Sequence, residues 1–227
     1  MSTAAGLRFG GTNGYVTFGN TSVLGLKTFT IETWFRRDGA GTTTSTGAIT
    51  AVPLVTKGRG EADGSNVDCN YFLGIDGATG RLAADFEDTT LSNNNHPVFG
   101  TTTIVNGVWY HAAATFDGTN FRIYLNGNLE GSVTSAAKPR YDSIQHAGLA
   151  TAMTSTGVAG GFFNGALDEA RIWNVARTQG QITSAINSEL TGPTTGLVAR
   201  WGLNEDAQTT VFSSAGTAVN GLSLIHI

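Results

Sequence analysis

The chain has 227 residues, a formal net charge of −4 and only 13% charged residues. The length fits one large domain or two small ones. The acidic balance excludes the basic surface of a nucleic-acid-binding protein, and no apolar run is long enough for membrane insertion. Its 31 glycines favour a turn-rich β protein. Cys69 is the single cysteine, which excludes an internal disulfide, and no signal peptide is visible.

The first part of the sequence predicts short strands joined by glycine-rich turns. Residues 7–9 and 15–18 are two such strands, and residues 29–37 predict a longer one because apolar and polar side chains alternate with period two. Phe29, Ile31, Thr33 and Phe35 share the face that we expect in the core, and Thr30, Glu32, Trp34 and Arg36 share the other. The Gly-, Thr- and Ser-rich residues 38–51 predict a flexible surface loop.

The middle of the chain predicts further strands in an antiparallel arrangement. Strands are expected at residues 52–57, 71–76, 81–87, 109–117, 121–126, 129–133, 141–150 and 162–174. Residues 58–70 and the Asn-rich residues 88–102 read as loops. Asn126-Gly127 predicts a tight hairpin turn because both residues tolerate positive φ.

One helix is expected near the C-terminus, over residues 178–190. Thr178 is placed to cap it, with Gln181 at the reciprocal position of a capping box. Ile182, Ala185, Ile186 and Leu190 form an apolar stripe at helical spacing, and Gly192-Pro193 ends the helix. Residues 197–203 then predict a returning strand.

These elements predict an all-β fold, a two-sheet antiparallel sandwich of the jelly-roll type with one short helix near the C-terminus. We expect a single domain over residues 1–221. The tail, residues 222–227, has two interpretations. It is either a last edge strand, or non-native sequence or the start of a truncated continuation.

Five segments, taken in order, carry a family resemblance. They are residues 7–16 (LRFGGTNGYV), 29–35 (FTIETWF), 108–117 (VWYHAAATFD), 121–127 (FRIYLNG) and 165–174 (GALDEARIWN). Together they resemble laminin-G-like modules of the concanavalin A-like lectin/glucanase superfamily. The resemblance implies a module of a large secreted or cell-surface bacterial protein, with other domains of the same longer chain beside it. Such modules usually bind or display, and rarely catalyse.

The resemblance also implies a structural calcium ion near the N-terminal strand. Asp168 would supply a carboxylate, and Gly11 and Asn13 would supply oxygens from the first turn, since calcium accepts both ligand types. One departure is Gly10, where the family often has an acidic residue. The alternative is that Asp168 or Glu169 forms an ion pair with Arg171 or with an arginine of another strand, such as Arg200.

A second oxygen-rich cluster lies in the predicted loop at residues 61–68. Asp63, Asn66 and Asp68 alternate with other residues around a glycine, as in calcium loops, although the acid at the twelfth position of an EF-hand is missing. The alternative, which we favour here, is that the loop is acidic only because it faces solvent.

Catalysis is not expected. The alternation in Asp85-Phe86-Glu87 resembles the acid pattern of β-glucanases but lacks the third acid, and Asp168 and Glu169 should point to opposite faces. No Gly-x-Ser-x-Gly motif is present. The scattered histidines predict no metal-bound histidine, and His111 should satisfy a hydrogen bond on a strand face.

Two tryptophans are candidate ligand-binding residues. Trp34 and Trp173 each share a strand face with charged side chains, so their indoles could stack on a sugar. The alternative is that both are packing residues, because Trp is highly buried on average. The sequence therefore predicts a non-catalytic module that binds carbohydrate or an extracellular protein ligand. A purely structural spacer is the alternative, and a glycoside hydrolase is a weaker one.

Overall fold

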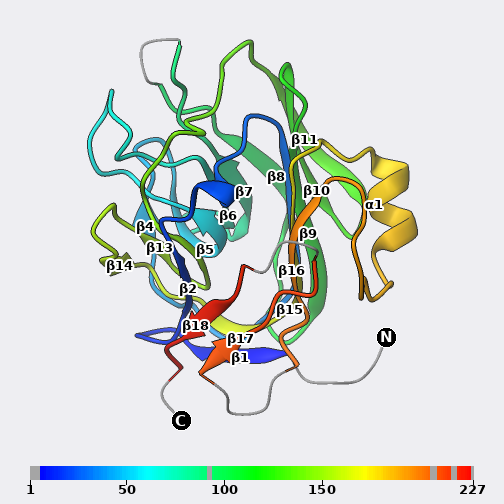
Figure 1. The fold of residues 1–227 in the computed structure, drawn as a ribbon. Coiled ribbons are helices and arrows are strands. Elements are labelled where there is room, and N and C mark those ends of the chain that lie inside the picture. The colour runs from blue at the N-terminus through cyan, green and yellow to red at the C-terminus, as the bar shows by residue number, and fades with distance from the viewer. Residues whose placement is uncertain (1–5, 91–93, 205–208, 216–218, 226–227) are drawn as a thin grey trace.

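The computed structural model describes residues 6–90, 94–204, 209–215 and 219–225. Within these ranges the chain forms two large antiparallel sheets packed face to face, with one α-helix on the outside (Figure 1). This confirms the predicted all-β, two-sheet sandwich with one short helix. None of the helices in the described ranges has the length and apolar character to cross a membrane.

Sheet I contains strands from both ends of the chain. Its order is β1 (Leu7–Gly10), β15 (Asn164–Trp173), β3 (Phe29–Arg37), β9 (Trp109–Phe116), β10 (Asn120–Leu125) and β11 (Asn128–Thr134), with β16 (Leu197–Trp201) also paired to β15. Asn126 and Gly127 have φ of 51° and 78°, which confirms the predicted tight turn between β10 and β11.

Sheet II faces sheet I across the core. Its order is β17 (Thr210–Val211), β18 (Gly221–Ser223), β2 (Val16–Gly19), β12 (Ala147–Leu149), β5 (Thr50–Lys57), β6 (Tyr71–Asp76), β7 (Arg81–Asp85) and β8 (Val98–Thr103), with β4 (Thr44–Ser45) paired to β5. A small pair, β13 (Ala152–Met153) and β14 (Ala159–Gly160), and a 3-10 turn, η1 (Ser22–Leu24), complete the described elements.

Several predicted boundaries differ from the structure. Residues 98–103, expected to be mostly loop, form the edge strand β8, and the strand expected at 141–150 shortens to Ala147–Leu149. Strand β18 crosses the expected end of the domain at residue 221. Its Leu222 pairs with Thr17 of β2, so this part of the tail is a strand of sheet II.

The core lies between the sheets and is rich in phenylalanine. Phe29, Phe86, Phe116 and Phe121 are all fully buried, and their ring centroids lie 4.7–6.4 Å apart. The face of β3 predicted to be buried does carry Phe29, Ile31 and Phe35 into this core, each with no exposed surface. Offset and edge-to-face ring contacts of this kind add to the stabilisation from burial.

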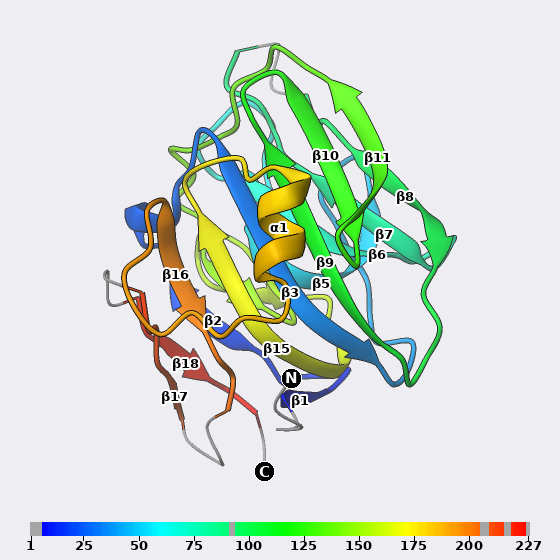
Figure 2. The same ribbon diagram turned by 90° about the vertical axis from the view of Figure 1, so that its right-hand side faces the viewer.

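Part of the opposite face of β3, Thr30 and Glu32, is buried as well, and α1 (Gln179–Ala185) covers the outside of sheet I (Figure 2). The predicted capping box of Thr178 and Gln181 is present. The helix ends at Ala185 instead of residue 190. The carbonyl oxygens at and just after its end accept hydrogen bonds from sheet side chains: those of Ala185 and Ser188 from Arg171, and that of Ile186 from Trp34. The Ser188 amide also donates to the Ala185 carbonyl, which closes the turn after the helix.

Candidate functional site

The calcium site implied at Asp168, Gly11 and Asn13 is not assembled. In the β1–β15 ladder Leu7 pairs with Leu167 and Gly10 with Asn164, so the register runs without a shift. Asp168 therefore lies beside Gly6, while Gly11 contacts the side chain of Asn164. Four residues of extended strand separate the two places by about 13 Å. One ion cannot contact the Asp168 carboxylate and the Gly11 turn, and this ligand set is wrong.

Glu169 forms the ion pairs that were considered for this region. A β-bulge lies between Asp168 and Arg171, and Glu169 adopts a left-handed φ of 50°. This geometry turns its carboxylate toward the guanidinium groups of Arg171, at 2.9 Å, and of Arg200. Asp168 is half-buried, and its Oδ1 has no hydrogen-bond partner. Burial, and then the Glu169 charge, raise the pKa of Asp168 to about 6.

A different set of carboxylates does converge. Asp63, Asp68 and Glu87 each place an oxygen within 4.8 Å of the others. Asp63 is exposed, whereas Asp68 is 1% and Glu87 0% exposed. The loop at 58–70, between β5 and β6, supplies the two aspartates, and Glu87 follows the end of β7. Within the described ranges, this is the one group of three or more His, Cys, Asp or Glu residues that could hold a metal ion.

Backbone hydrogen bonds hold Asp68 and Glu87 together. The amide of Glu87 donates to the Cys69 carbonyl at 3.1 Å, and the Cys69 amide donates to Oδ1 of Asp68 at 2.7 Å. The other oxygens, Oδ2 of Asp68 and Oε2 of Glu87, are buried with no hydrogen-bond partner. Burial raises the pKa of both carboxyl groups. The pKa of Glu87 rises to about 9, because its protonated form can donate a hydrogen bond to Asp68 and because the Asp68 charge lies beside it, whereas the same hydrogen bond lowers the pKa of Asp68.

The cluster predicted from the sequence shares two residues with this group. It contained Asp63 and Asp68 but not Glu87, which is 19 positions beyond Asp68 and whose alternation with Asp85 was weighed only as a catalytic pattern. The main-chain oxygen of Asn66 accepts a hydrogen bond from the Ile144 amide at 2.9 Å. Asp85 has a separate environment, since Thr46, Asn95 and the His96 amide all donate to its buried carboxylate.

The two tryptophans predicted to bind a ligand both make contacts within the fold. Trp173 is 2% exposed, its indole nitrogen donates to Glu32 at 2.8 Å, and the Arg177 guanidinium lies 4.1 Å from its ring. Trp34 is half-buried, and its indole nitrogen donates to the Ile186 carbonyl at the end of α1. A sugar cannot stack on a covered ring, so the prediction is wrong for Trp173. For Trp34, contact with α1 favours the packing alternative.

Glu32 is the centre of a buried charge network under α1. Its carboxylate, 0% exposed, lies 3.1 Å from Arg177, 3.7 Å from Arg171 and 3.6 Å from the His111 ring. Neither ring nitrogen of His111 makes a hydrogen bond, contrary to the expectation for this residue. Burial lowers the pKa of His111 to about 4, so the ring is neutral at pH 7.

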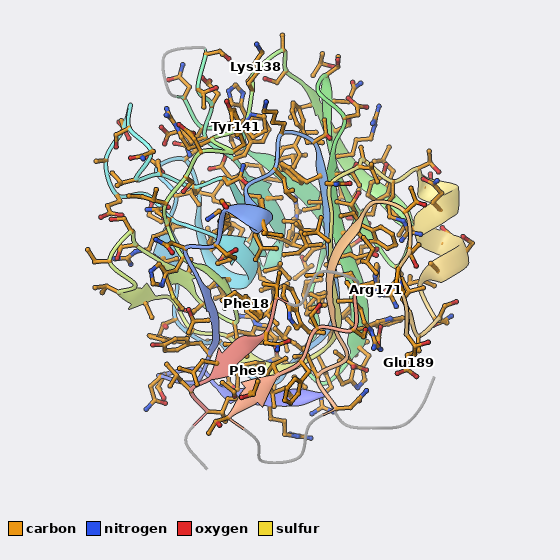
Figure 3. All side chains as sticks on the ribbon, viewed as in Figure 1. Phe9, Phe18, Lys138, Tyr141, Arg171 and Glu189 are labelled. Atoms are coloured by element: carbon orange, nitrogen blue, oxygen red, sulfur yellow. The ribbon has the colours of Figure 1, made fainter. Side chains whose placement is uncertain are left out.

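The surface has an open hollow of about 600 Å³ at the end of the sandwich where Tyr141 lies (Figure 3). Tyr141 is 41% and Val23 43% exposed. The Lys27 ammonium lies 4.4 Å from the Tyr141 ring centroid, and Thr28 and Asn174 add polar groups to the wall. An exposed aromatic ring beside hydrogen-bonding groups in a concavity is the arrangement of a small-ligand site.

A second open hollow, of about 500 Å³, lies over β2 and β18. Its lining includes Tyr15, His146, Asn220 and Leu222. Tyr15 is half-buried, and its ring centroid lies 6.1 Å from that of Phe162. Its aromatic ring is therefore less available than that of Tyr141.

The fold and the sequence agree on the family. A family model described as "Concanavalin A-like lectin/glucanases superfamily" matches residues 9–183, more than three quarters of the chain. The chain therefore belongs to this superfamily, as its laminin-G-like motifs suggested. No curated protein sequence matches it.

Solved structures share the fold at low sequence identity. A candidate carbohydrate-binding protein from Bacteroides ovatus aligns with a TM-score of 0.65 and 18% identity over 97% of this chain and 58% of its own. A heptameric SAP-like pentraxin from Limulus polyphemus aligns with a TM-score of 0.58 and 16% identity, over 96% of this chain and 94% of its own. The CBM40 of a Ruminococcus gnavus sialidase, bound to α2,3-sialyllactose, aligns with a TM-score of 0.56 and 17% identity, over 80% of this chain and 96% of its own. The chain thus spans little more than half the length of the Bacteroides protein.

Proposed function

We propose that this chain is a non-catalytic carbohydrate-binding module of a larger extracellular protein, and that the sugar binds in the hollow beside Tyr141. The Tyr141 ring carries the proposal, because it is 41% exposed and an exposed aromatic ring can stack on a pyranose ring, with the Lys27 ammonium 4.4 Å from the ring centroid. Two similar structures, the Bacteroides protein and the sialidase module, are described by their carbohydrate binding.

The polar groups around Tyr141 suit a sugar better than an apolar ligand. Lys27 is exposed and can donate hydrogen bonds, and the Asn174 side chain can both donate and accept them. The cationic Lys27 would also favour a sugar that carries a carboxylate. Both hollows are open, as expected for a module that binds part of a longer glycan.

The positions of the carboxylates favour binding over hydrolysis. A retaining glycosidase needs two carboxyl groups about 5–5.5 Å apart that flank the bond to be cleaved. The pair considered from the sequence, Asp85 and Glu87, has no exposed surface at either residue. A glycan cannot reach groups that are buried in this way.

The experiment is glycan-array binding by the chain, followed by calorimetric titration of any glycan retained. We expect Tyr141→Ala to lower the affinity at least tenfold while the melting temperature changes by only a few degrees, because the ring is on the surface. Tyr15→Ala is the matched control, since it removes the tyrosine of the second hollow. Equal loss in both variants, or loss only in Tyr15→Ala, would place the ligand elsewhere.

Two other functions remain outcomes of this test. If the folded chain retains no glycan, the module is a spacer or binds an extracellular protein. Pull-down of extracellular proteins with the unmodified chain and with Tyr141→Ala would then separate these two functions. A spacer retains no protein with either chain, whereas a protein-binding module retains one with the unmodified chain. Detectable glycan cleavage would contradict the non-catalytic part of the proposal.

A further inference from the structure

Asp68 and Glu87 present an electrostatic problem that is solved either by a proton shared between them or by a bound cation. Both side chains are essentially unexposed, and each has an oxygen with no hydrogen-bond donor. A buried carboxylate oxygen without a partner is costly, and two together are more so. The exposed Asp63 brings a third carboxyl group, with its oxygen within 4.8 Å of the other two. A bound cation would stabilise the charged form of all three carboxyl groups.

We propose that Asp63, Asp68 and Glu87 hold a calcium ion, which ties the loop at 58–70 to the end of β7. The three ligands are oxygen atoms, as a hard divalent cation requires. Two are fixed by backbone hydrogen bonds, while Asp63 faces solvent and leaves room for water ligands. Calcium tolerates such an irregular, partly hydrated shell, whereas magnesium demands near-ideal octahedral geometry.

The local cations do not neutralise this cluster. The Arg140 guanidinium contributes one positive charge nearby, but it also lies 3.7 Å from Asp142, and its Nη2 donates to the Asp88 carbonyl at 3.2 Å. With all three carboxyl groups ionised, one shared guanidinium leaves the site net negative, so the ionised state needs a further cation. The proposal rests on this geometry and does not depend on glycan binding.

The test is calorimetric titration of the metal-stripped chain with calcium chloride alone, together with melting curves in calcium, in magnesium and in excess chelator. We expect a single site that prefers calcium. The melting temperature should rise by about 3–6 °C for each tenfold increase in free calcium above the dissociation constant, since only the folded state binds.

Asp63→Asn is the key variant because Asp63 is exposed and its substitution should not prevent folding. We expect at least a tenfold weaker calcium affinity. Glu87→Gln should abolish the response. Glu61→Gln is the matched control from the same loop. The Glu61 carboxylate accepts hydrogen bonds from Ser155 and Gln145. We therefore expect the variant to be less stable but to keep its calcium response.

Equal melting temperatures in millimolar calcium and in chelator, with no binding heat, would overturn the proposal, and Asp68 and Glu87 would then share a proton. Calcium binding that survives Asp63→Asn and Glu87→Gln unchanged would overturn the assignment of the ligands. Because the readouts contain no sugar, a failed glycan array leaves this result unaffected.

Discussion

The indole nitrogen of Trp173 donates a hydrogen bond of 2.8 Å to the Glu32 carboxylate, across 141 residues of sequence. This contact joins two neighbouring strands, β15 and β3, under the helix. The same carboxylate oxygen lies 3.1 Å from the Arg177 guanidinium, which also covers the Trp173 ring. The tryptophan therefore orients a buried charge that anchors the segment leading into α1.

Trp173→Phe should lower the free energy of unfolding by about 1–3 kcal/mol. Phenylalanine keeps a ring beside Arg177 but removes the donor to a fully buried carboxylate. Urea denaturation followed by circular dichroism measures this. Trp34→Phe is the comparison, because it loses one hydrogen bond at a half-buried position and should cost less. A larger loss in Trp34→Phe would contradict this account of the network.

Glu169→Gln should destabilise the protein by about 3–5 kcal/mol, because it removes the charge that Arg171 and Arg200 share. These arginines are 1% and 4% exposed, and a buried charge without its partner is costly. Thermal melting gives the change. Asp168→Asn, at the adjacent residue, is the control. Asp168 forms no ion pair with the described residues and its Oδ1 lacks a hydrogen-bond partner, so the substitution should be neutral or stabilising. A neutral Glu169→Gln would mean that Glu189 alone compensates Arg200.

Thr178→Ala should cost about 1 kcal/mol, through loss of the side-chain cap on the Gln181 amide. Urea denaturation of the variant gives this difference. Thr183→Ala lies in the exposed interior of the same helix and has better helix propensity, so it should cost nothing. If both substitutions had the same effect, the cap would not be what stabilises the start of α1.

His111 should make the stability depend on pH between about 4 and 6.5. Its folded-state pKa of about 4 is below the ordinary value, so the unfolded chain binds a proton that the folded chain rejects. Stability from this residue is complete above pH 6.5 and is lost as the pH falls toward 4, by up to about 1.4 kcal/mol per pH unit. Arg171 and Arg177 oppose protonation, while Glu32 favours it.

Denaturation curves measured from pH 4 to pH 7 test this slope. His111→Gln should flatten it, since glutamine does not titrate. If the slope is unchanged in the variant, other groups, such as the carboxylates, determine the acid sensitivity.

Local features were predictable from the sequence where neighbouring residues determine them. The core face of 29–37, the turn at Asn126-Gly127 and the cap at Thr178 each depend on a few adjacent side chains, and all three are confirmed. Strand β8 was missed because its partners are non-local. It lies at the edge of its sheet, where Glu130 accepts hydrogen bonds from the amides of Thr101 and Thr102.

The candidate sites were less predictable because they depend on register. The resemblance associated Asp168 with the first turn, but only the pairing of Leu7 with Leu167 shows how far apart they lie. The early end of α1 was also not predictable, because it depends on hydrogen bonds that Arg171 and Trp34 of sheet I donate to the carbonyls of Ala185 and Ile186. Glu87 joins Asp68 through a backbone contact between distant segments that no local pattern indicates.

The position of β15 has a consequence for the order in which the chain can fold. This strand lies between β1 and β3, although it follows them by more than 120 residues. During synthesis both earlier strands remain without their shared neighbour until residue 173 has been made. Such distant pairings make refolding slow, in the range of milliseconds to seconds, and expose strand edges to aggregation meanwhile. A fragment that ends before residue 164 should accumulate as aggregate, whereas the full chain recovers from denaturant.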